Sequence, residues 1–193
     1  ETCLYKNTDT GDYAIANLTD EVGYYTTLGS GVSSIFDSSA KLIMPMDTGT
    51  TPNDISGNNN DFTNSGMTQI DGLYGKAYDG ADGSDYMYTP SISISSGTIS
   101  FWWKPDAAGS NHDRLFQFAV DSSNRITLGY SSNCGKEICF YAKEGGTNTI
   151  SWEHSINEPS LDTWHHMGVS ITGSRIKVYV DGSLKLNVSE TQD

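Results

Sequence analysis

The sequence predicts an all-β protein, a two-sheet antiparallel jelly-roll sandwich, from three observations. Apolar and polar residues alternate with a period of two over runs of about five to seven residues, as in half-buried strands. Clusters of Gly, Asn, Asp and Ser, which favour turns, separate these runs. No stretch has a convincing helical period. Many short antiparallel strands at this spacing are typical of a sandwich or jelly roll.

Six alternating runs are expected to supply the core. In the last of them, Lys177 and Tyr179 occupy the opposite, polar face. The apolar members are, in chain order, Ile99, Phe101 and Trp103; Phe116, Phe118 and Val120; Ile138, Phe140 and Ala142; Ile150 and Trp152; Met167, Val169 and Ile171; and Ile176, Val178 and Val180. Residues 26–40, TTLGSGVSSIFDSSA, are the one linker-like stretch.

Length and charge restrict the class of protein. The 193 residues suffice for one domain, and 24 acidic against 11 basic residues give a net charge of -13. Such a surface repels nucleic-acid phosphates and anionic lipids, so neither is an expected partner. No apolar run approaches the roughly 18 residues of a membrane span. The start at Glu1 has no signal-peptide pattern, so we expect a mature product or a piece of something larger.

The cysteines indicate an oxidising compartment. Cys134 and Cys139, in SSNCGKEIC, lie between two strand-like runs, and their spacing suits a disulfide that closes a hairpin. Two free thiols are the alternative. Cys3 does not supply the second ligand pair that a zinc site needs. Asn17 and Asn187 stand in glycosylation sequons.

Catalytic patterns are mostly missing, so the sequence predicts a protein that is not an enzyme. A retaining glucanase needs two carboxylates about 5 Å apart, but Glu153 and Glu158 share no face. Nucleophile-elbow, phosphate-loop and zinc-protease motifs are also missing from the sequence. His165 and His166, at the start of a strand, should point to opposite faces, which favours packing over catalysis for this pair.

An oxygen-rich loop runs from residue 47 to 61, DTGTTPNDISGNNND. Calcium takes six to eight oxygen ligands, and a loop bent at glycine can bring them together. A solvated turn fits the composition equally well, because Asn and Asp satisfy their own backbone in turns. The candidate calcium ligands in this loop, which carry side-chain carboxylate or amide oxygens, are Asp47, Asn53, Asp54, Asn58, Asn59, Asn60 and Asp61. A second acidic group in DGADGSD is interpreted as an exposed hairpin turn; it consists of Asp79, Asp82 and Asp85.

From Lys41 onward the chain resembles a laminin-G-like domain of the concanavalin A-like lectin/glucanase superfamily. Pieces typical of that family follow in its order: KLIMPMDTG, NDISGNNND, GLYGKAYDGADGSDYMYTP, GTISFWWKPD and, last, DTWHHMGVSITGSRIKVYVDGSLKL. The WHH…VYVDG combination is the most specific of them. The resemblance implies the jelly-roll fold predicted above.

The chain departs from the family in its order. Two further strands normally follow YVDG, but here their counterparts are Leu4-Tyr5 and Asp20-Glu21-Val22, near the start. We therefore expect residues 1–25 to complete a jelly roll whose main part is 41–193, joined by the 26–40 linker. Three arrangements stay open: a circular permutant, donation of strands to a neighbouring subunit, and a window cut from a tandem array. Donation would leave an open sheet edge to be paired by a copy of the chain. We also expect the 20–22 strand to pair with residues 42–44.

The resemblance also implies a function: an extracellular or cell-surface structural or adhesive module, part of an assembly, filament or repeat array, with calcium-assisted glycan contact. A carbohydrate-binding module of a larger secreted glycan-active enzyme is the alternative. The calcium ligands that the resemblance implies are Asp47, Asp54, Asn58 and Asp20, or, in a second arrangement, Asp121 and Asn124 with Asn7 and Asp9. Glycan binding would need an exposed aromatic platform, for which alternation suggests Trp102 and Tyr130.

Overall fold

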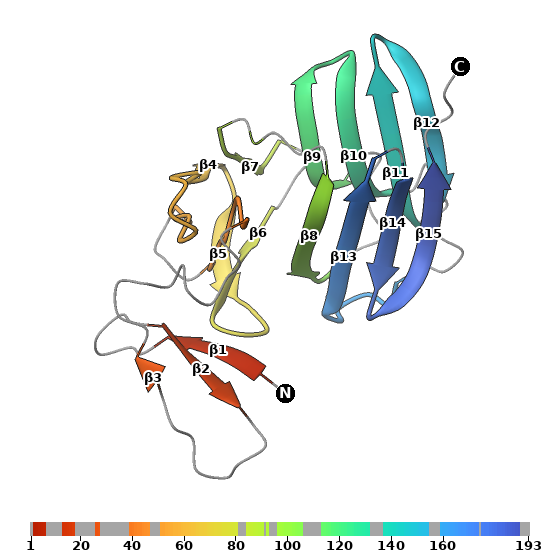
Figure 1. Cartoon of the computed structure of the whole chain (residues 1–193). Helices are drawn as coiled ribbons and strands as arrows, with labels where there is room; N and C mark the ends of the chain where they lie inside the picture. Colours follow the sequence, from red (N-terminus) through yellow and green to blue (C-terminus); the bar gives the residue numbers. More distant parts are fainter. Residues whose placement is uncertain are drawn as a thin grey trace. The chain divides into compact units, whose positions relative to one another are not determined.

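The computed structural model describes the chain as strands, turns and irregular segments, with no helix among the described residues (Figure 1). The described residues are 2–6, 13–17, 26–27, 39–46, 51–80, 84–90, 92, 96–105, 113–131, 137–154, 159–173 and 175–189. The strands are β1 (Thr2–Lys6), β2 (Tyr13–Asn17), β3 (Thr26–Thr27), β4 (Thr63–Ser65), β5 (Thr68–Asp71), β6 (Lys76–Asp79), β7 (Tyr86–Tyr88), β8 (Ser96–Trp103), β9 (Asp113–Asp121), β10 (Asn124–Ser131), β11 (Glu137–Glu144), β12 (Thr147–His154), β13 (His165–Thr172), β14 (Arg175–Val180) and β15 (Ser183–Ser189).

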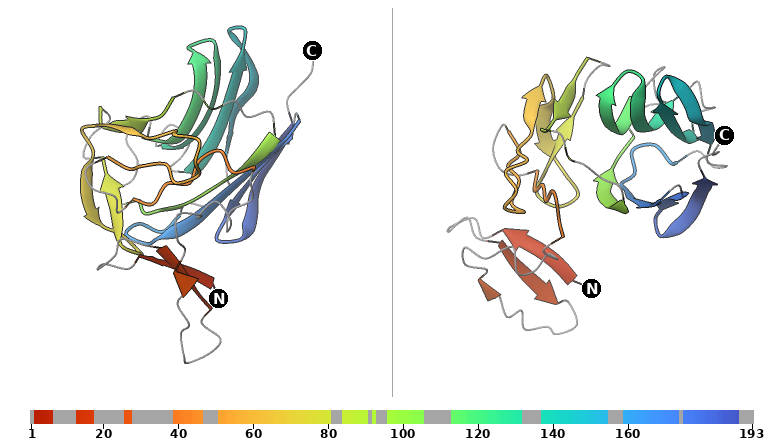
Figure 2. Two further views of the ribbon diagram at one scale, coloured as in Figure 1. Left: turned by 60° about the vertical axis from the view of Figure 1, so that its left-hand side comes forward. Right: turned by 45° about the horizontal axis from the view of Figure 1, so that its top comes forward.

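Two compact units divide the chain. The first comprises residues 1–64 and 88–90, and the second comprises 65–87 and 91–193. In the second unit, two four-stranded antiparallel sheets have the orders β12-β11-β10-β9 and β15-β14-β13-β8. Figure 2 shows these sheets as two layers, green to teal and blue. This arrangement confirms the predicted all-β, two-sheet sandwich.

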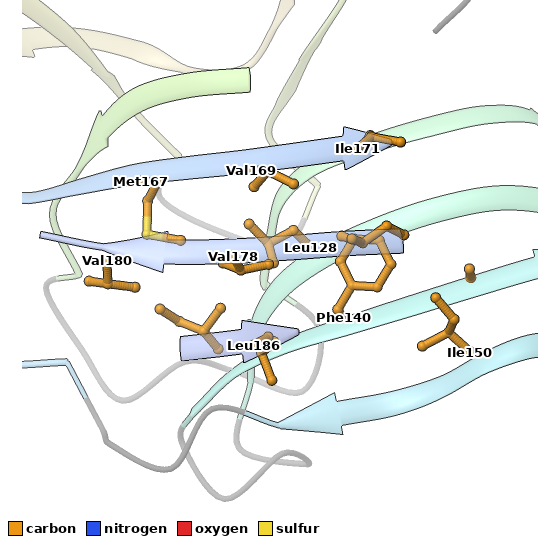
Figure 3. Packing of buried hydrophobic residues seen from close by; sticks show 12 residues of the cluster. Leu128, Phe140, Ile150, Met167, Val169, Ile171, Val178, Val180 and Leu186 are labelled. Carbon is orange, nitrogen blue, oxygen red and sulfur yellow. The ribbon is translucent and has the colours of Figure 1, made fainter. Parts of the chain in front are cut away.

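The core of the second unit fills the space between these two sheets. Leu128 and Phe140 come from one sheet, Met167 and Val178 from the other, and all four are fully buried. Figure 3 shows their side chains pointing toward one another. Strand β13 buries every second residue from His165 onward, as its alternating sequence predicts. Burying apolar area at roughly 25 cal/mol per Å² is what holds the two layers together.

Among the predicted core residues whose side chains the structure describes, Val120 is the exception. The alternation places it beside Phe118, yet it is 90% exposed. The register of β9 against β10 shifts between Asn124 and Arg125, so that 119 and 121 are paired and Val120 has no residue opposite. A bulge of this kind breaks the inward and outward alternation, and the prediction for Val120 was wrong for that reason.

The first unit contains a three-stranded antiparallel sheet of order β1-β2-β3. A strand was predicted at Leu4 and Tyr5, and both residues lie in β1, where they pair with Ile15 and Ala14 of β2. Asp20-Glu21-Val22 lies outside the described residues. Residues 42–44 form no strand; the Ile43 carbonyl instead accepts a hydrogen bond from the Ile55 amide at 2.9 Å. The shifted order, with its 1–25, 26–40 and 41–193 boundaries, therefore stays a prediction.

Candidate functional site

An aromatic cluster lies on the outer face of the β8–β13 pair. Trp102 and His166 are directly opposite each other in the register of these strands, with ring centroids 5.2 Å apart. Both side chains point away from the core, because their neighbours Trp103 and His165 point inward. The Trp102 side chain is 47% exposed. The sequence prediction for Trp102 is thus confirmed in its exposure.

Tyr74 joins this cluster from the turn between β5 and β6. Its ring meets Trp102 edge-on, with centroids 6.3 Å apart, and it is 67% exposed. The Gly72 amide donates to the Gly75 carbonyl at 2.9 Å, and Gly75 has a φ of 70°, which favours glycine. An exposed ion pair between Lys76 and Asp71 closes the same hairpin at 2.6 Å. The hairpin therefore presents Tyr74 at its tip, next to Trp102.

Polar groups lie beside the rings on the same sheet face. Ser100 Oγ is 2.8 Å from His166 Nε2. The register then places Gly168 opposite Ser100 on one side and opposite Tyr179 on the other. Gly168 carries no side chain, so the sheet surface between Ser100 and Tyr179 stays open. We call Tyr74, Trp102, His166, Ser100 and Tyr179 the aromatic face.

Tyr130, the second predicted platform residue, is not part of this face. It is 2% exposed, and its ring packs against Trp103 at 5.2 Å. Its alternation with Leu128 already placed it on the inward side of β10, and that signal could have excluded it. Tyr74 was missed because it lies in a turn, where strand periodicity gives no direction. An aromatic residue in a glycine-flanked turn, GLYGK, was the available signal.

The buried His165 side chain contacts Asp181 and Ser160, both of which are exposed. Its Nδ1 lies 2.8 Å from Asp181 Oδ2, and its Nε2 lies 3.0 Å from the Ser160 carbonyl and 3.2 Å from Ser160 Oγ. A carbonyl oxygen only accepts, so Nε2 donates to it and cannot also take a proton from Ser160. These contacts therefore anchor β13 to the turn at Asp181 instead of activating a serine. His165 points inward and His166 outward, as predicted.

The predicted calcium loop is organised by hydrogen bonds to Asp54. Asp54 Oδ1 accepts the amides of Ile43 and Ser56, and Oδ2 accepts the Asn60 amide and the Ser56 hydroxyl. Asn58 Nδ2 donates to the Ala40 carbonyl at 2.9 Å. These donors occupy both oxygens of the Asp54 carboxylate, as in a turn whose backbone is satisfied by its own side chains. Asp47 and Asp20 lie outside the described residues, and calcium binding stays a prediction.

The Asp54 carboxylate should stabilise this loop whether or not calcium is present. Burial raises the pKa of Asp54, but hydrogen bonds from Ile43, Ser56 and Asn60 outweigh it, and the pKa lies below its ordinary value of 3.8. A carboxyl with a lowered folded pKa stabilises above the unfolded pKa and loses this effect as pH falls through the folded pKa.

Asp54→Ala should therefore abolish hydrogen-exchange protection of the Ile43, Ser56 and Asn60 amides, with chelator present. Wild-type protection should itself weaken below about pH 4. Thr51→Ala, at an exposed position of the same loop, is the control. If Asp54→Ala lost protection only in the presence of calcium, the loop would depend on the metal instead.

The alternative metal ligands are arranged as turn chemistry. Asp121 Oδ1 accepts the Ser123 amide at 2.6 Å, and Asn124 Nδ2 lies 3.1 Å from both Asp121 oxygens. The pKa of Asp121 is lowered, first by the Ser123 amide and then by the Asn124 side chain. Asn7 and Asp9 lie outside the described residues. Among the residues that the structure describes, no three His, Cys, Asp or Glu side chains gather as a metal group.

The remaining predicted positions are placed as follows. Cys139 is disulfide-bonded and fully buried; Cys134 lies outside the described residues, so their pairing stays a prediction. Asn187 is exposed on β15 and accepts a hydrogen bond from Arg175 at 3.2 Å. Asn17 ends β2, Glu153 lies in β12, Asp79 ends β6 and Asp85 directly precedes β7. Asp82 and Glu158 lie outside the described residues.

Comparison of the amino-acid sequence with protein-family models shows the family of this chain. A family model described as the concanavalin A-like lectin/glucanases superfamily matches residues 79–193, more than half of the chain. The chain belongs to this superfamily. The match includes GTISFWWKPD and WHH…VYVDG, the pieces on which the resemblance rested. No curated protein matches the chain.

Three solved structures are similar in fold. Domain 4 of AbnA, a GH43 extracellular arabinanase from Geobacillus stearothermophilus, in complex with arabinotriose, is 22% identical with a TM-score of 0.59, over 73% of this chain and 71% of that one. An S-layer domain-containing protein from Clostridium thermocellum is 20% identical with a TM-score of 0.51, over 77% and 72%. The carbohydrate-binding module CBM66 from Bacillus subtilis is 20% identical, with a TM-score of 0.48, over 68% and 80%. At these identities the likeness to the arabinanase domain and to the S-layer domain-containing protein concerns the fold.

Proposed function

We propose that this protein is an extracellular glycan-binding module and that sugars bind on the aromatic face. The observation that carries the proposal is the exposure of Trp102 and Tyr74 side by side, at 47% and 67%. Large aromatic rings are costly to leave in water, and exposed apolar patches rimmed by polar groups mark binding sites. The apolar C–H faces of a pyranose or furanose ring match such a surface.

Two polar side chains beside the rings, Ser100 and His166, can hydrogen-bond to sugar hydroxyls. Ser100 Oγ and His166 Nε2 already share a 2.8 Å contact beside the Trp102 ring. Sugar hydroxyls donate and accept, so they can bond to either group. Tyr179 lies across Gly168 from Ser100, which extends the face along the sheet for a second sugar unit. An extended, open face of this kind suits a chain polysaccharide better than a single sugar.

The extracellular setting is part of the proposal. The arabinanase that contains a similar domain is extracellular, and another similar structure is that of an S-layer domain-containing protein. A disulfide at Cys139 agrees with an oxidising compartment. No helix in the described part of the chain is long and apolar enough to cross a membrane. The proposal has two finer parts. Copies of the chain assemble through residues 1–25, and calcium serves as a structural ion.

Substitution of Trp102 tests the function directly. Affinity electrophoresis against laminarin, arabinan, levan and xylan identifies the bound glycan, and Trp102→Ala should weaken its binding about tenfold or more, as expected for an aromatic anchor. Tyr74→Ala should give a smaller loss. Val120→Ala, which truncates an exposed apolar side chain on the other sheet, is the control. Equal loss in the Trp102 and Val120 variants, or hydrolysis of the glycan, would contradict the proposal.

A further inference from the structure

The sheet that carries the aromatic face has no acidic residue in its strands. Strands β8, β13, β14 and β15 contain no Asp or Glu, but they contain Arg175, Lys177 and Lys185. The strands of the other four-stranded sheet contain the acidic residues Asp113, Asp121, Glu137, Glu144 and Glu153. In a chain whose net charge is -13, this distribution leaves one sheet with cationic side chains and no acidic ones.

The Arg175 and Lys177 side chains lie on the same outer surface as the aromatic face. Both alternate along β14 with Ile176 and Val178, which are buried in the core, so they point to the same side as Tyr179. Arg175 is exposed and Lys177 is half-buried. Both cationic groups are therefore accessible to a ligand that lies on this surface.

Short polar side chains flank the two cations across the strands. Lys177 lies between Ser170 of β13 and Asn187 of β15, and Arg175 is opposite Thr172 of β13. Arg175 Nη1 donates a hydrogen bond to Asn187 Oδ1 at 3.2 Å. The hydroxyl and amide groups at these positions can bond to sugar hydroxyls. We call Ser170, Thr172, Arg175, Lys177 and Asn187 the basic strip.

The described carboxylates do not neutralise the basic strip. Within the part of the chain that the structure describes, no ion pair joins Arg175 or Lys177 to an acidic side chain. Asp181, which follows β14, is four residues or about 13 Å along the chain from Lys177. Its two oxygens are engaged by His165 Nδ1 and by the His166 amide. The positive charge of the strip therefore faces the solvent.

The basic strip continues the aromatic face along the strands. On the outer side of β13, His166 is opposite Trp102, Gly168 follows two residues later, and Ser170 is opposite Lys177. The step from His166 to Ser170 is about 13 Å, a length that a few linked sugar units cover. A polysaccharide with one ring against Trp102 can thus pass over the open surface at Gly168 and reach Lys177.

We infer that the glycan bound by this protein is a uronic-acid polysaccharide, with sugar rings on the aromatic face and carboxylates on Lys177 and Arg175. The inference rests on the function proposed above and specifies the class of glycan. An ammonium and a guanidinium both form charge-assisted hydrogen bonds with a carboxylate, and these are stronger than bonds between neutral groups.

A chain with about one carboxylate per sugar suits the basic strip better than a denser polyanion does. Lys177 and Arg175 are separated by about 7 Å along β14, and neutral polar groups surround them. The acidic residues of the other sheet lie behind a core about 10 Å thick, beyond the Debye length of about 8 Å at physiological salt. Sulfated glycans and nucleic acids carry more charge, so the net charge of -13 repels them more strongly.

Polygalacturonate and its methyl ester test the inference, because they share a sugar backbone and differ in charge. Wild type should bind polygalacturonate about tenfold more tightly at low salt, and high salt should remove the difference. Lys177→Gln should weaken polygalacturonate binding about three- to fivefold and leave ester binding unchanged, and adding Arg175→Gln should bring the loss to about tenfold. Lys143→Gln, the same change at a half-buried lysine of the other sheet, is the control and should have no effect.

Trp102→Ala distinguishes a failure of the inference from a failure of the proposed function, since it should weaken binding of both polymers. Equal wild-type affinities for acid and ester, or equal losses in the Lys177 and Lys143 variants, would overturn the inference. The proposed function would stand if Trp102→Ala still weakened ester binding. Polygalacturonate binding that depends on Lys177 but not on Trp102 would overturn both.

Two denser polyanions, dextran sulfate and a single-stranded DNA oligonucleotide, complete the set of probes. Polygalacturonate should bind more tightly than either at physiological salt. Equally tight binding of dextran sulfate or DNA would show an unselective polyanion surface and would overturn the inference.

Discussion

Phe140→Ala is expected to lower the free energy of unfolding of the second unit by about 3–5 kcal/mol, the usual cost of truncating a buried aromatic ring. Phe140 is fully buried on β11, opposite Leu128 of β10, and faces the second sheet. The loss combines the apolar area returned to water with the cavity left between two sheets that cannot collapse fully. Urea denaturation followed by tryptophan fluorescence measures it.

Val120→Ala is the matched control for Phe140→Ala. The two residues are both apolar strand residues of the same sheet, but Val120 is 90% exposed. Its truncation should change stability by no more than about 0.5 kcal/mol. Comparable losses at both positions would contradict the placement of the core between the two sheets.

The second large effect is expected at Asp181. Its Oδ2 contacts His165 Nδ1 at 2.8 Å, and its Oδ1 accepts the His166 amide at 2.9 Å. Asp181 also has a φ of 50°, a conformation that Asp and Asn tolerate better than Ala does. Asp181→Ala should therefore cost about 2 kcal/mol, a value that allows for the screening of a half-exposed carboxylate. Asp181→Asn should recover part of it.

The Asp181 effect should depend on pH in a defined direction. Burial raises its pKa, but the hydrogen bonds from His165 and from the His166 amide outweigh it, and the pKa lies below its ordinary value of 3.8. The carboxylate therefore stabilises the fold above pH 3.8, and this contribution is lost as pH falls through the lower folded pKa. Thermal melts of wild type and Asp181→Ala should differ most at pH 6, and the difference should narrow below pH 3.8 to the part that comes from the backbone conformation. A constant difference would contradict this assignment.

Alternation predicted the sheet core because each residue of a regular strand faces one side. Met167, Val169 and Val178 lie where the sequence placed them. The prediction failed at Val120, where a bulge interrupts the alternation, since a bulge depends on the pairing of two strands and not on one strand's residues.

The candidate site could be predicted only in part. Trp102 was recoverable because it stands next to the inward Trp103 on a long strand. Tyr74 was not, because its position depends on the β5–β6 turn and on how that hairpin meets β8. Residue types near in sequence predicted the fold class, while the aromatic face depends on contacts between strands and turns.

The central claim, that glycans bind on the aromatic face, is tested most directly by following the indole N–H signals of the four tryptophans during titration with the glycan that the electrophoresis identifies. The Trp102 signal should shift progressively with saturation. The Trp103 signal should stay, because that ring faces inward against Tyr130. Saturable binding that leaves the Trp102 signal unchanged would contradict the account.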